Sequence, residues 1–322
     1  MDRHIEEYLA HLLIQLAQEG IELQEQREIA WGIQLRLLRG TEKAVLNLYY
    51  SEKKGLSKVV GAAAGSALKA KLEQLVSSDA VPEGQLHHWE SWIGSDECGK
   101  GDYFGSLVVA AFALERSRAG ELKKLGVKDS KLLGDSEIIA LAKQLYERFR
   151  GQINCIVLKP PKYNDLIESM KRQYKNLNDL LAWQHGTAIL ELLHKRSGIQ
   201  GILVDQFSRS RKVERFLKDK GTDITIVEVS GAEADPAVAA ASVIARYQFL
   251  LHRQDLNRYY KMDFPKGSGK AVQKAGREFI DRYSLQRLRE VAKLHFITSH
   301  ALQQREIFVS DQETTHPPQT KH

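Results

Sequence analysis

Residues 94–105 hold the densest group of side chains in this chain that could do chemistry. Two adjacent carboxylates, Asp96 and Glu97, follow a short apolar stretch, and a glycine-rich turn containing Lys100 comes next. Because neighbouring strand residues point to opposite faces, two adjacent acids can serve one site only where the strand ends and its backbone turns. A carboxylate pair beside a glycine turn with one lysine suits a divalent metal that holds a phosphate. The alternative is a solvated acidic hairpin.

Two further segments carry acids at positions typical of functional sites. An apolar strand expected at 201–205 ends in Asp205, and the end of a buried strand is a favoured catalytic position in α/β folds. The alternative for this residue is a turn-forming or capping role. Later in the chain, Pro236 fits the first turn of a helix, so Asp235 is predicted to be its N-cap. Glu233 is then left without a structural task, and we assign it to the site.

Convergence of these acids would require a metal. Four carboxylates in one place repel one another, and some would keep their protons at neutral pH. Divalent cations relieve the repulsion, and ligands that are all oxygen favour Mg²⁺ or Mn²⁺ over zinc. Two such ions about 3.5–4 Å apart can activate a water and stabilise a leaving oxygen in phosphodiester cleavage. From the residues alone, the inference extends to metal-dependent phosphoryl chemistry on a polyanion.

The elements that must position these acids fall into two parts. Residues 1–85 have the pattern of a small helix–sheet–helix unit, with a helix expected at 3–18, strands near 22–27, 30–38 and 43–50, and a helix at 62–76. A polar stretch with Pro and Gly follows, and the end of this linker is placed at 86–90. Its two histidines, His87 and His88, are expected to be solvated.

The second part, residues 91–308, alternates apolar strands with helical segments, which predicts an α/β domain. Strands are expected at 92–97, 106–114, 153–158, 201–205 and 224–229, and helices at 136–149, 163–171, 178–196, 212–219, 236–259 and 271–290. Alanines in the helix after Pro236 form a small-residue face that can lie close to a sheet and bring Glu233 near the strand ends. The polar tail, 309–322, is predicted to be disordered.

The composition is that of a globular protein without a membrane-spanning segment or a disulfide framework. The chain has 322 residues, of which 43% are hydrophobic and 27% charged, as in an ordinary globular protein. It has no run of about 18 apolar residues and no signal-like segment, so a cytoplasmic location without membrane contact is expected. Two cysteines, Cys98 and Cys155, support neither a disulfide framework nor a zinc site. The net charge of +6 suits a polyanionic partner such as nucleic acid, and no oligomer is indicated.

Several segments resemble the type 2 ribonuclease H superfamily, and more closely its type 3 branch (ribonuclease HIII). The matching segments follow family order: 94–105, 127–131, 176–178, 204–207, 232–233 with 239–246, 264–267 and 293–296. The resemblance implies a ribonuclease H-like mixed sheet flanked by helices. It also implies that the N-terminal unit is a substrate-binding domain, α+β and similar to the TATA-binding-protein fold.

By that resemblance the chain is an endonuclease that cuts the RNA strand of RNA–DNA hybrids and leaves 3′-hydroxyl and 5′-phosphate ends. The Asp-Glu-Asp-Glu set of type 3 enzymes falls on Asp96, Glu97, Asp205 and Glu233. The spacing after Glu233 looks about one residue shorter than usual, which keeps Asp235 as the alternative fourth ligand. Type 2 enzymes carry an Arg in the glycine loop where this chain has Lys100, so weak cutting at single embedded ribonucleotides is expected.

The remaining motif residues are expected to contact substrate. Backbone N–H groups in the turn can hold the scissile phosphate or a neighbouring 2′-hydroxyl, and basic side chains can reach phosphates. The candidates are Gly99, Lys100, Gly101, Ser130, Lys131 and Lys266. Ser130 is equally suited to capping the helix that follows it. His185 is expected to be packed or solvated, and no chemical step is assigned to His295.

In the N-terminal unit, aromatic and basic residues could stack on nucleic acid and neutralise its backbone. These residues are Tyr49, Tyr50, Lys53, Lys54 and Lys58, although the tyrosines are also suited to covering the sheet. Two other functions stay open. One is a hybrid-binding module without turnover, against which the presence of all four acids argues. The other is a type 2 repair nuclease, which Lys100 and Glu233 disfavour.

Overall fold

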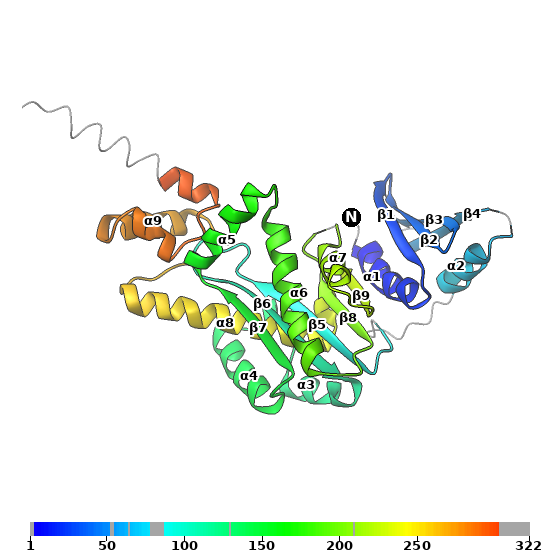
Figure 1. Cartoon of the computed structure of the whole chain (residues 1–322), viewed down its shortest axis with the longest axis horizontal. Coiled ribbons are helices and arrows are strands. Elements are labelled where there is room, and N and C mark those ends of the chain that lie inside the picture. Colours follow the sequence, from blue (N-terminus) through cyan, green and yellow to red (C-terminus); the bar gives the residue numbers. More distant parts are fainter. Residues whose placement is uncertain are drawn as a thin grey trace, which may run out of the picture.

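The computed structural model describes residues 3–51, 55–63, 65–77, 87–128, 130–208 and 210–302. These residues form two sheets, each with its own helices (Figure 1). The expected tail at 309–322, the middle of the expected linker, and Lys53 and Lys54 lie outside the described residues. No helix in the described ranges is long and apolar enough to cross a membrane.

The first unit is an antiparallel sheet of four strands in sequence order, with helices packed on one face. Alternation along the strands explains this arrangement: Ile33, Leu35 and Leu37 are buried against the helices, whereas the residues between them are less buried. The elements are α1 (Arg3–Gln18), β1 (Glu22–Ile29), β2 (Gly32–Arg39), β3 (Glu42–Ser51), β4 (Gly55–Ala62) and α2 (Ala67–Ser77).

Strand β4 corrects the sequence prediction, which has only three strands here. It pairs antiparallel with β3, so that Val60 lies opposite Leu46 and Lys58 opposite Leu48. Glycines and a lysine interrupt its alternation of apolar residues, and pairing with β3 decides its conformation instead. The following helix therefore begins at Ala67, five residues after the predicted start at residue 62.

The second unit is built on a mixed sheet, as the resemblance implies. Its strand order is β7-β6-β5-β8-β9, in which β5 runs antiparallel to β6 and parallel to β8. Both faces of the central strands are buried, which is why these strands are continuous apolar runs. The strands are β5 (Ser91–Cys98), β6 (Leu107–Glu115), β7 (Ile153–Leu158), β8 (Gly201–Asp205) and β9 (Thr225–Val229).

Helices cover this sheet on both faces (Figure 1). One face packs against α3 (Ala119–Leu125), α4 (Asp135–Arg148) and the long α8 (Pro236–Tyr260). The other face packs against α5 (Pro160–Arg172), α6 (Leu177–Lys195) and α7 (Lys212–Asp219). Helix α9 (Lys270–Arg282) forms a separate small cluster with the residues around Phe104 and Phe264.

Two features of the helices differ from the sequence prediction. Helix α3 is not predicted, because its seven residues are too few to show a helical repeat. The helix predicted at 271–290 ends at Arg282, and a 3₁₀ helix at Gln286–Glu290 follows. Ser284, with φ of 143°, interrupts the run, although the apolar spacing continues across it.

Close approach of α8 to β5 sets the geometry of the acidic residues. A Cβ atom at Gly94 of β5 would lie 2.3 Å from the backbone nitrogen of Val238, so only glycine fits there. Ala237, Ala240 and Ala241 of α8 are fully buried against the sheet. The predicted small-residue face is therefore confirmed, and it holds the start of α8 directly beside the strand that carries Asp96.

Candidate functional site

Parallel pairing of β5 and β8 brings two of the predicted acids together. Ser95 lies opposite Val204 in the register, so Asp96 and Asp205 follow at the same edge of the sheet. Asp96, Glu97 and Asp205 all line a hollow of about 430 Å³ at this edge. Strand β5 continues to Cys98, one residue beyond the acid pair, before the backbone turns at Gly99 with φ of 92°.

The aspartates lie in an environment that disfavours their charge. Burial, together with the negative charge of Glu97, raises the pKa of Asp96 to about 7. Burial, followed by the charges of Asp96 and Glu233, raises the pKa of Asp205 to about 8. A bond of 3.2 Å from the backbone nitrogen of Ala232 to Asp205 offsets this only in part. Both aspartates therefore tend to hold protons unless positive charge is supplied.

Glu233 lies beside the hollow on a 3₁₀ helix, Ala232–Ala234, just before α8. Its Oε1 accepts a bond of 3.1 Å from Lys131, and its Oε2 is buried without a partner in the part of the chain that the structure describes. Burial alone would raise the pKa of Glu233, but hydrogen bonds from its own backbone and from Lys131 lower the pKa. Its charge in turn raises the pKa of both aspartates, which places all four predicted acids in mutual electrostatic contact.

Glu97 is held on the other side of β5 by His185 of α6. The His185 Nε2 atom lies 3.2 Å from Oε2 of Glu97, and Lys100 Nζ lies 3.7 Å from Oε1. From the sequence, His185 is expected to be packed or solvated. It is indeed buried, but it contacts a candidate catalytic acid. The signal that could have indicated this contact is the place of His185 in the apolar stripe of α6, between Leu181 and Ala188. A histidine in such a stripe is buried, and a buried imidazole needs hydrogen-bond partners.

Asp235 is confirmed as the N-cap of α8. Its carboxylate accepts bonds from the backbone nitrogens of Ala237 and Val238, and also from Trp92 Nε1 at 3.0 Å. His87 Nε2 lies 3.1 Å from its second oxygen. With both oxygens engaged and only 4% exposed, Asp235 has no free side toward the hollow, which leaves Glu233 as the candidate fourth acid.

The expectation that both linker histidines are solvated is wrong for His87. Its ring is buried, stacks on Trp89 at 4.3 Å and meets the edge of Trp92 at 4.4 Å. Its neighbour His88 is exposed, as expected. His87 therefore attaches the chain before β5 to the cap of α8.

The residues predicted to contact substrate surround the same hollow. One of them, Lys131, also pairs with Glu233. Gly99, Lys100, Gly101, Ser130, Lys131 and Lys266 all line it. Lys266 is bound by Asp135, with Nζ 2.7 Å from both carboxylate oxygens. Ser130 hydrogen-bonds Ser242 of α8 at 2.8 Å, and α4 has Gly134 as its N-cap, so the capping alternative for Ser130 is wrong.

Cys98 and His295 have no evident chemical task. Burial raises the pKa of the Cys98 thiol to about 12, which keeps it a neutral core group. His295 lies 3.1 Å from the hydroxyl of Tyr163, and burial lowers its pKa to about 4. Both residues support the fold around the site.

No three His, Cys, Asp or Glu side chains among the described residues are grouped as a preassembled metal site. The donor chemistry nevertheless fits a divalent cation. All four acids offer oxygen, and one Glu233 oxygen is buried without a partner among the described residues. Burial and repulsion between the acids raise the pKa values of Asp96 and Asp205, and a cation would relieve the repulsion.

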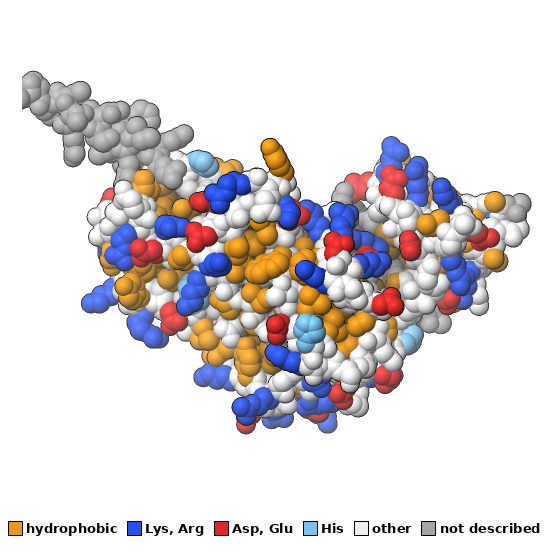
Figure 2. All heavy atoms as spheres, in the orientation of Figure 1, with side chains coloured by type: hydrophobic (Ala, Val, Ile, Leu, Met, Phe, Trp, Pro, Cys, Tyr) orange, Lys and Arg blue, Asp and Glu red, His pale blue; other side chains and the backbone are white. Residues whose placement is uncertain are grey.

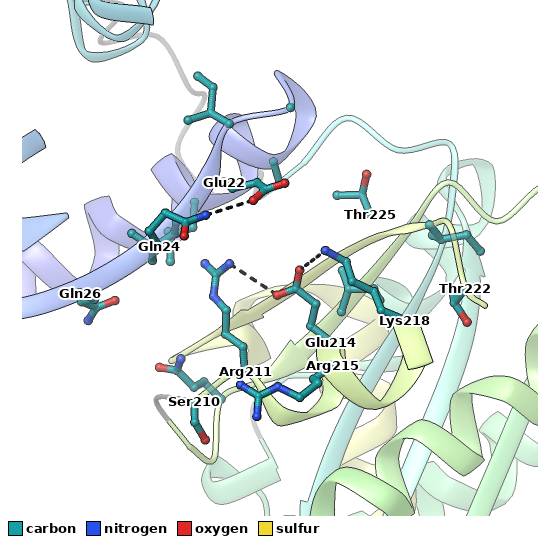
Figure 3. Close-up of a pocket in the computed structure, with 18 of the residues that line it drawn as sticks. Glu22, Gln24, Gln26, Ser210, Arg211, Glu214, Arg215, Lys218, Thr222 and Thr225 are labelled. Carbon is teal, nitrogen blue, oxygen red and sulfur yellow. Dashed lines mark hydrogen bonds and ion pairs between the residues drawn. The ribbon is translucent and has the colours of Figure 1, made fainter. Parts of the chain in front are cut away.

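A larger hollow of about 850 Å³ lies elsewhere, between α1 and β1 of the first unit and α7 and β9 of the second (Figure 3). Glu214 lies at its centre and pairs with Lys218 at 2.9 Å and with Arg211 at 3.5 Å. Glu214 and these two bases thus satisfy one another there. On the face drawn in Figure 2, Lys and Arg side chains are likewise scattered among acidic ones and form no single patch.

Comparison with known proteins identifies the family to which the chain belongs. Residues 93–299 match the ribonuclease HII family. Ribonuclease HIII of Protochlamydia amoebophila (strain UWE25) is 41% identical over 210 residues, which cover 65% of this chain and 67% of that protein. Ribonuclease HIII of Chlamydia pneumoniae is 41% identical over 210 residues, covering 64% and 68%.

Among solved structures, Bst-RNase HIII in complex with Mn²⁺ superimposes with a TM-score of 0.60 at 26% identity and covers 97% of both chains. The alignment with that structure thus includes both sheets, and the family match spans every candidate acid. The chain belongs to the ribonuclease HII family, and within it to the ribonuclease HIII branch.

Proposed function

We propose that this chain is a divalent-metal-dependent endonuclease that hydrolyses the RNA strand of RNA–DNA hybrids and leaves 3′-hydroxyl and 5′-phosphate ends. One observation carries the proposal: acids of β5 and β8 line one hollow beside Glu233, and burial together with the charges of the neighbouring acids raises the pKa values of Asp96 and Asp205. Such mutual repulsion is typical of a site built for cations. Membership of the ribonuclease HIII branch supplies the substrate class.

The acids proposed to hold Mg²⁺ or Mn²⁺, in a two-metal site, are Asp96, Glu97, Asp205 and Glu233. The bound cations supply activation of a water and charge stabilisation of the leaving oxygen. Asp96 and Asp205 must release their protons when a cation binds, because their pKa values of about 7 and about 8 leave them partly protonated near neutral pH. Strands β5 and β8 hold the backbones of these two residues in place.

The glycine turn after β5 is proposed to receive the scissile phosphate. Gly101 has open space around its Cα, so a sugar–phosphate backbone can approach the N–H groups of 99–101 closely. Lys131 is 74% exposed and reaches Glu233, where it can neutralise a neighbouring phosphate. Lys100, Lys266 and Ser130 complete the proposed substrate contacts. Specificity for RNA would come from contact with a 2′-hydroxyl.

The first unit, residues 1–85, is proposed to grip the hybrid, and residues 91–308 to form the catalytic domain. The sheet face away from α1 and α2 carries Arg36, Asn47 and Tyr49, whereas Tyr50 and Lys58 contact the helix-covered side. Only the former set is therefore suited to nucleic acid. Replacing Arg36 and Tyr49 together by Gln and Ala should raise KM for hybrid and leave kcat unchanged.

A monomer in the cytoplasm completes the proposal. All four acids come from one chain, so no second copy is needed for the site. Both cysteines are unpaired, as is usual in a reducing compartment.

Cleavage of two labelled substrates tests the function. One is an RNA–DNA hybrid and the other a DNA duplex with a single ribonucleotide, each with Mg²⁺, Mn²⁺ or EDTA. Metal-dependent cutting of the hybrid, with little cutting of the single ribonucleotide, is expected. Efficient cutting of both would identify a repair nuclease instead, and binding of the hybrid without any cutting would identify a binding module.

A further inference from the structure

We propose that His185 is a positioning residue that fixes the Glu97 carboxylate for metal binding. The inference rests on the proposed function, because it assigns a support to one of the four acids. His185 is completely buried on α6 and faces β5. Its Nδ1 atom lies 2.8 Å from the hydroxyl of Ser95, and its Nε2 atom lies 3.2 Å from Oε2 of Glu97. One imidazole thus spans two residues on the same face of one strand.

The available protons orient this contact. The Ser95 hydroxyl has one proton and two neighbours, the carbonyl of Ala110 at 2.9 Å and Nδ1 of His185. If Ser95 donates to Nδ1, the neutral ring carries its proton on Nε2. If Ser95 donates to Ala110, Nδ1 must itself donate to the hydroxyl, and a neutral ring then has no proton on Nε2. The first arrangement is the one in which a neutral ring points an N–H from α6 at Glu97.

Packing holds the imidazole in this orientation. The ring of Phe207 stacks on it with centroids 5.1 Å apart and planes 19° from parallel. Phe207 follows Asp205 by two residues, and its carbonyl accepts a bond of 3.3 Å from Lys100. Lys100 in turn approaches the other oxygen of Glu97. The support for Glu97 therefore joins α6, the end of β8 and the glycine turn.

A purely structural role would not require a histidine here. The neighbours of His185 on the stripe of α6 are Leu181, Ala188 and Ile189, all fully buried, so an apolar side chain would fill the same space. A leucine would remove both hydrogen bonds and leave Glu97 free to take other rotamers. A glutamine could replace them, because its amide offers a donor for Glu97 and an acceptor for Ser95. Residues that orient a metal-binding acid typically change metal affinity or activity by about 10- to 100-fold.

The test compares His185→Leu and His185→Gln in the full chain. Mn²⁺ alone is titrated into each protein by calorimetry, and cleavage of the hybrid is measured against Mn²⁺ concentration. We expect His185→Leu to weaken Mn²⁺ binding about 10- to 100-fold and to lower kcat, with KM for hybrid within about twofold of the original. His185→Gln should recover most of both losses.

His252→Leu is the matched control. His252 is also a buried helical histidine, but its Nδ1 atom has no hydrogen-bond partner within the described ranges, and it does not line the hollow. This control should bind Mn²⁺ and cleave as the unmodified chain does. If His185→Leu fails to fold, Ser95→Ala replaces it, because loss of the Nδ1 partner should give a smaller defect of the same kind.

Unchanged Mn²⁺ affinity in His185→Leu, or an equal defect in the Leu and Gln variants, would overturn the positioning role. These outcomes are distinct from failure of the proposed function. In that case the unmodified chain itself would neither bind Mn²⁺ nor cleave the hybrid.

Discussion

Asp96 and Glu97 are neighbours in β5, yet they are held in opposite ways. Asp96 faces α8 and lies among acids, with its pKa raised to about 7 by burial and by Glu97. Glu97 faces α6 and lies between a histidine and a lysine. The α8 side of the site therefore depends on added cations to relieve repulsion, whereas the α6 side already supplies donors. A two-sided site of this kind can bind a metal strongly and still keep one acid oriented before the metal arrives.

The largest expected effect comes from removing an acid on the α8 side. Asp205→Asn should lower single-turnover cleavage of the hybrid by on the order of 10³-fold or more, because a proposed metal ligand is lost. Hybrid binding measured in EDTA should be unchanged. The control is Asp255→Asn, which replaces an exposed acid of α8 that pairs with Arg258 and does not line the hollow, and this variant should cleave normally. Retained cleavage by Asp205→Asn would remove Asp205 from the site.

The pH dependence of stability in the metal-free chain tests whether the acids on the α8 side destabilise the fold when they are charged. The pKa values of Asp96 and Asp205 are raised in the folded state, so the folded chain binds more protons than the unfolded chain between about pH 4 and about pH 8. Their contribution to stability is therefore lost as pH rises through this window.

Urea unfolding in EDTA measures this loss. Asp205→Asn should gain stability relative to the unmodified chain as pH rises from 4 to 8. The gain should reach a few kcal/mol, since one pKa unit corresponds to about 1.4 kcal/mol. Added Mn²⁺ should stabilise the unmodified chain more at pH 8 than at pH 6. A difference between the two proteins that does not grow with pH would contradict the mutual repulsion of these acids.

The junction between the units gives a smaller effect on the same α8 side. His87→Ala removes one of the partners of Asp235, the residue that caps α8 directly after the turn that carries Glu233. Loss of this buried contact should destabilise the chain by about 1–3 kcal/mol and lower kcat modestly. Thermal unfolding and steady-state cleavage measure both changes. His88→Ala changes the exposed neighbour and should alter neither stability nor kcat. Equal behaviour of the two variants would argue against a stabilising contact between His87 and Asp235.

The smallest effect is expected at the exposed base beside Glu233. Lys131→Gln should weaken hybrid binding a few-fold and reduce the slope of log affinity against log salt by about one, since one proposed phosphate contact is lost. Lys143→Gln, an exposed lysine of α4 outside the hollow, is the control. An unchanged salt slope for Lys131→Gln would exclude this contact.

Much of the site could be predicted because its signals are local. Strand alternation, a glycine turn after two acids, and a proline after a capping aspartate each act within a few residues. The strands that carry Asp96 and Asp205 and the cap at Asp235 could therefore be placed from the sequence, although β5 continues to Cys98. Where the local pattern was weak, as in β4 with its glycines, or continued past a break, as at Ser284, the prediction failed.

The sequence by itself determined which residues could bind a metal and which elements carry them, since residue type and periodicity are properties of short segments. Tertiary structure decided their partners: His185 lies 88 residues from Glu97 and His87 lies 148 residues from Asp235. Lys266 lies 131 residues from the Asp135 that holds it. Such contacts form only when strands and helices pack, because burial forces each polar group to find a donor or acceptor wherever the fold brings one within reach.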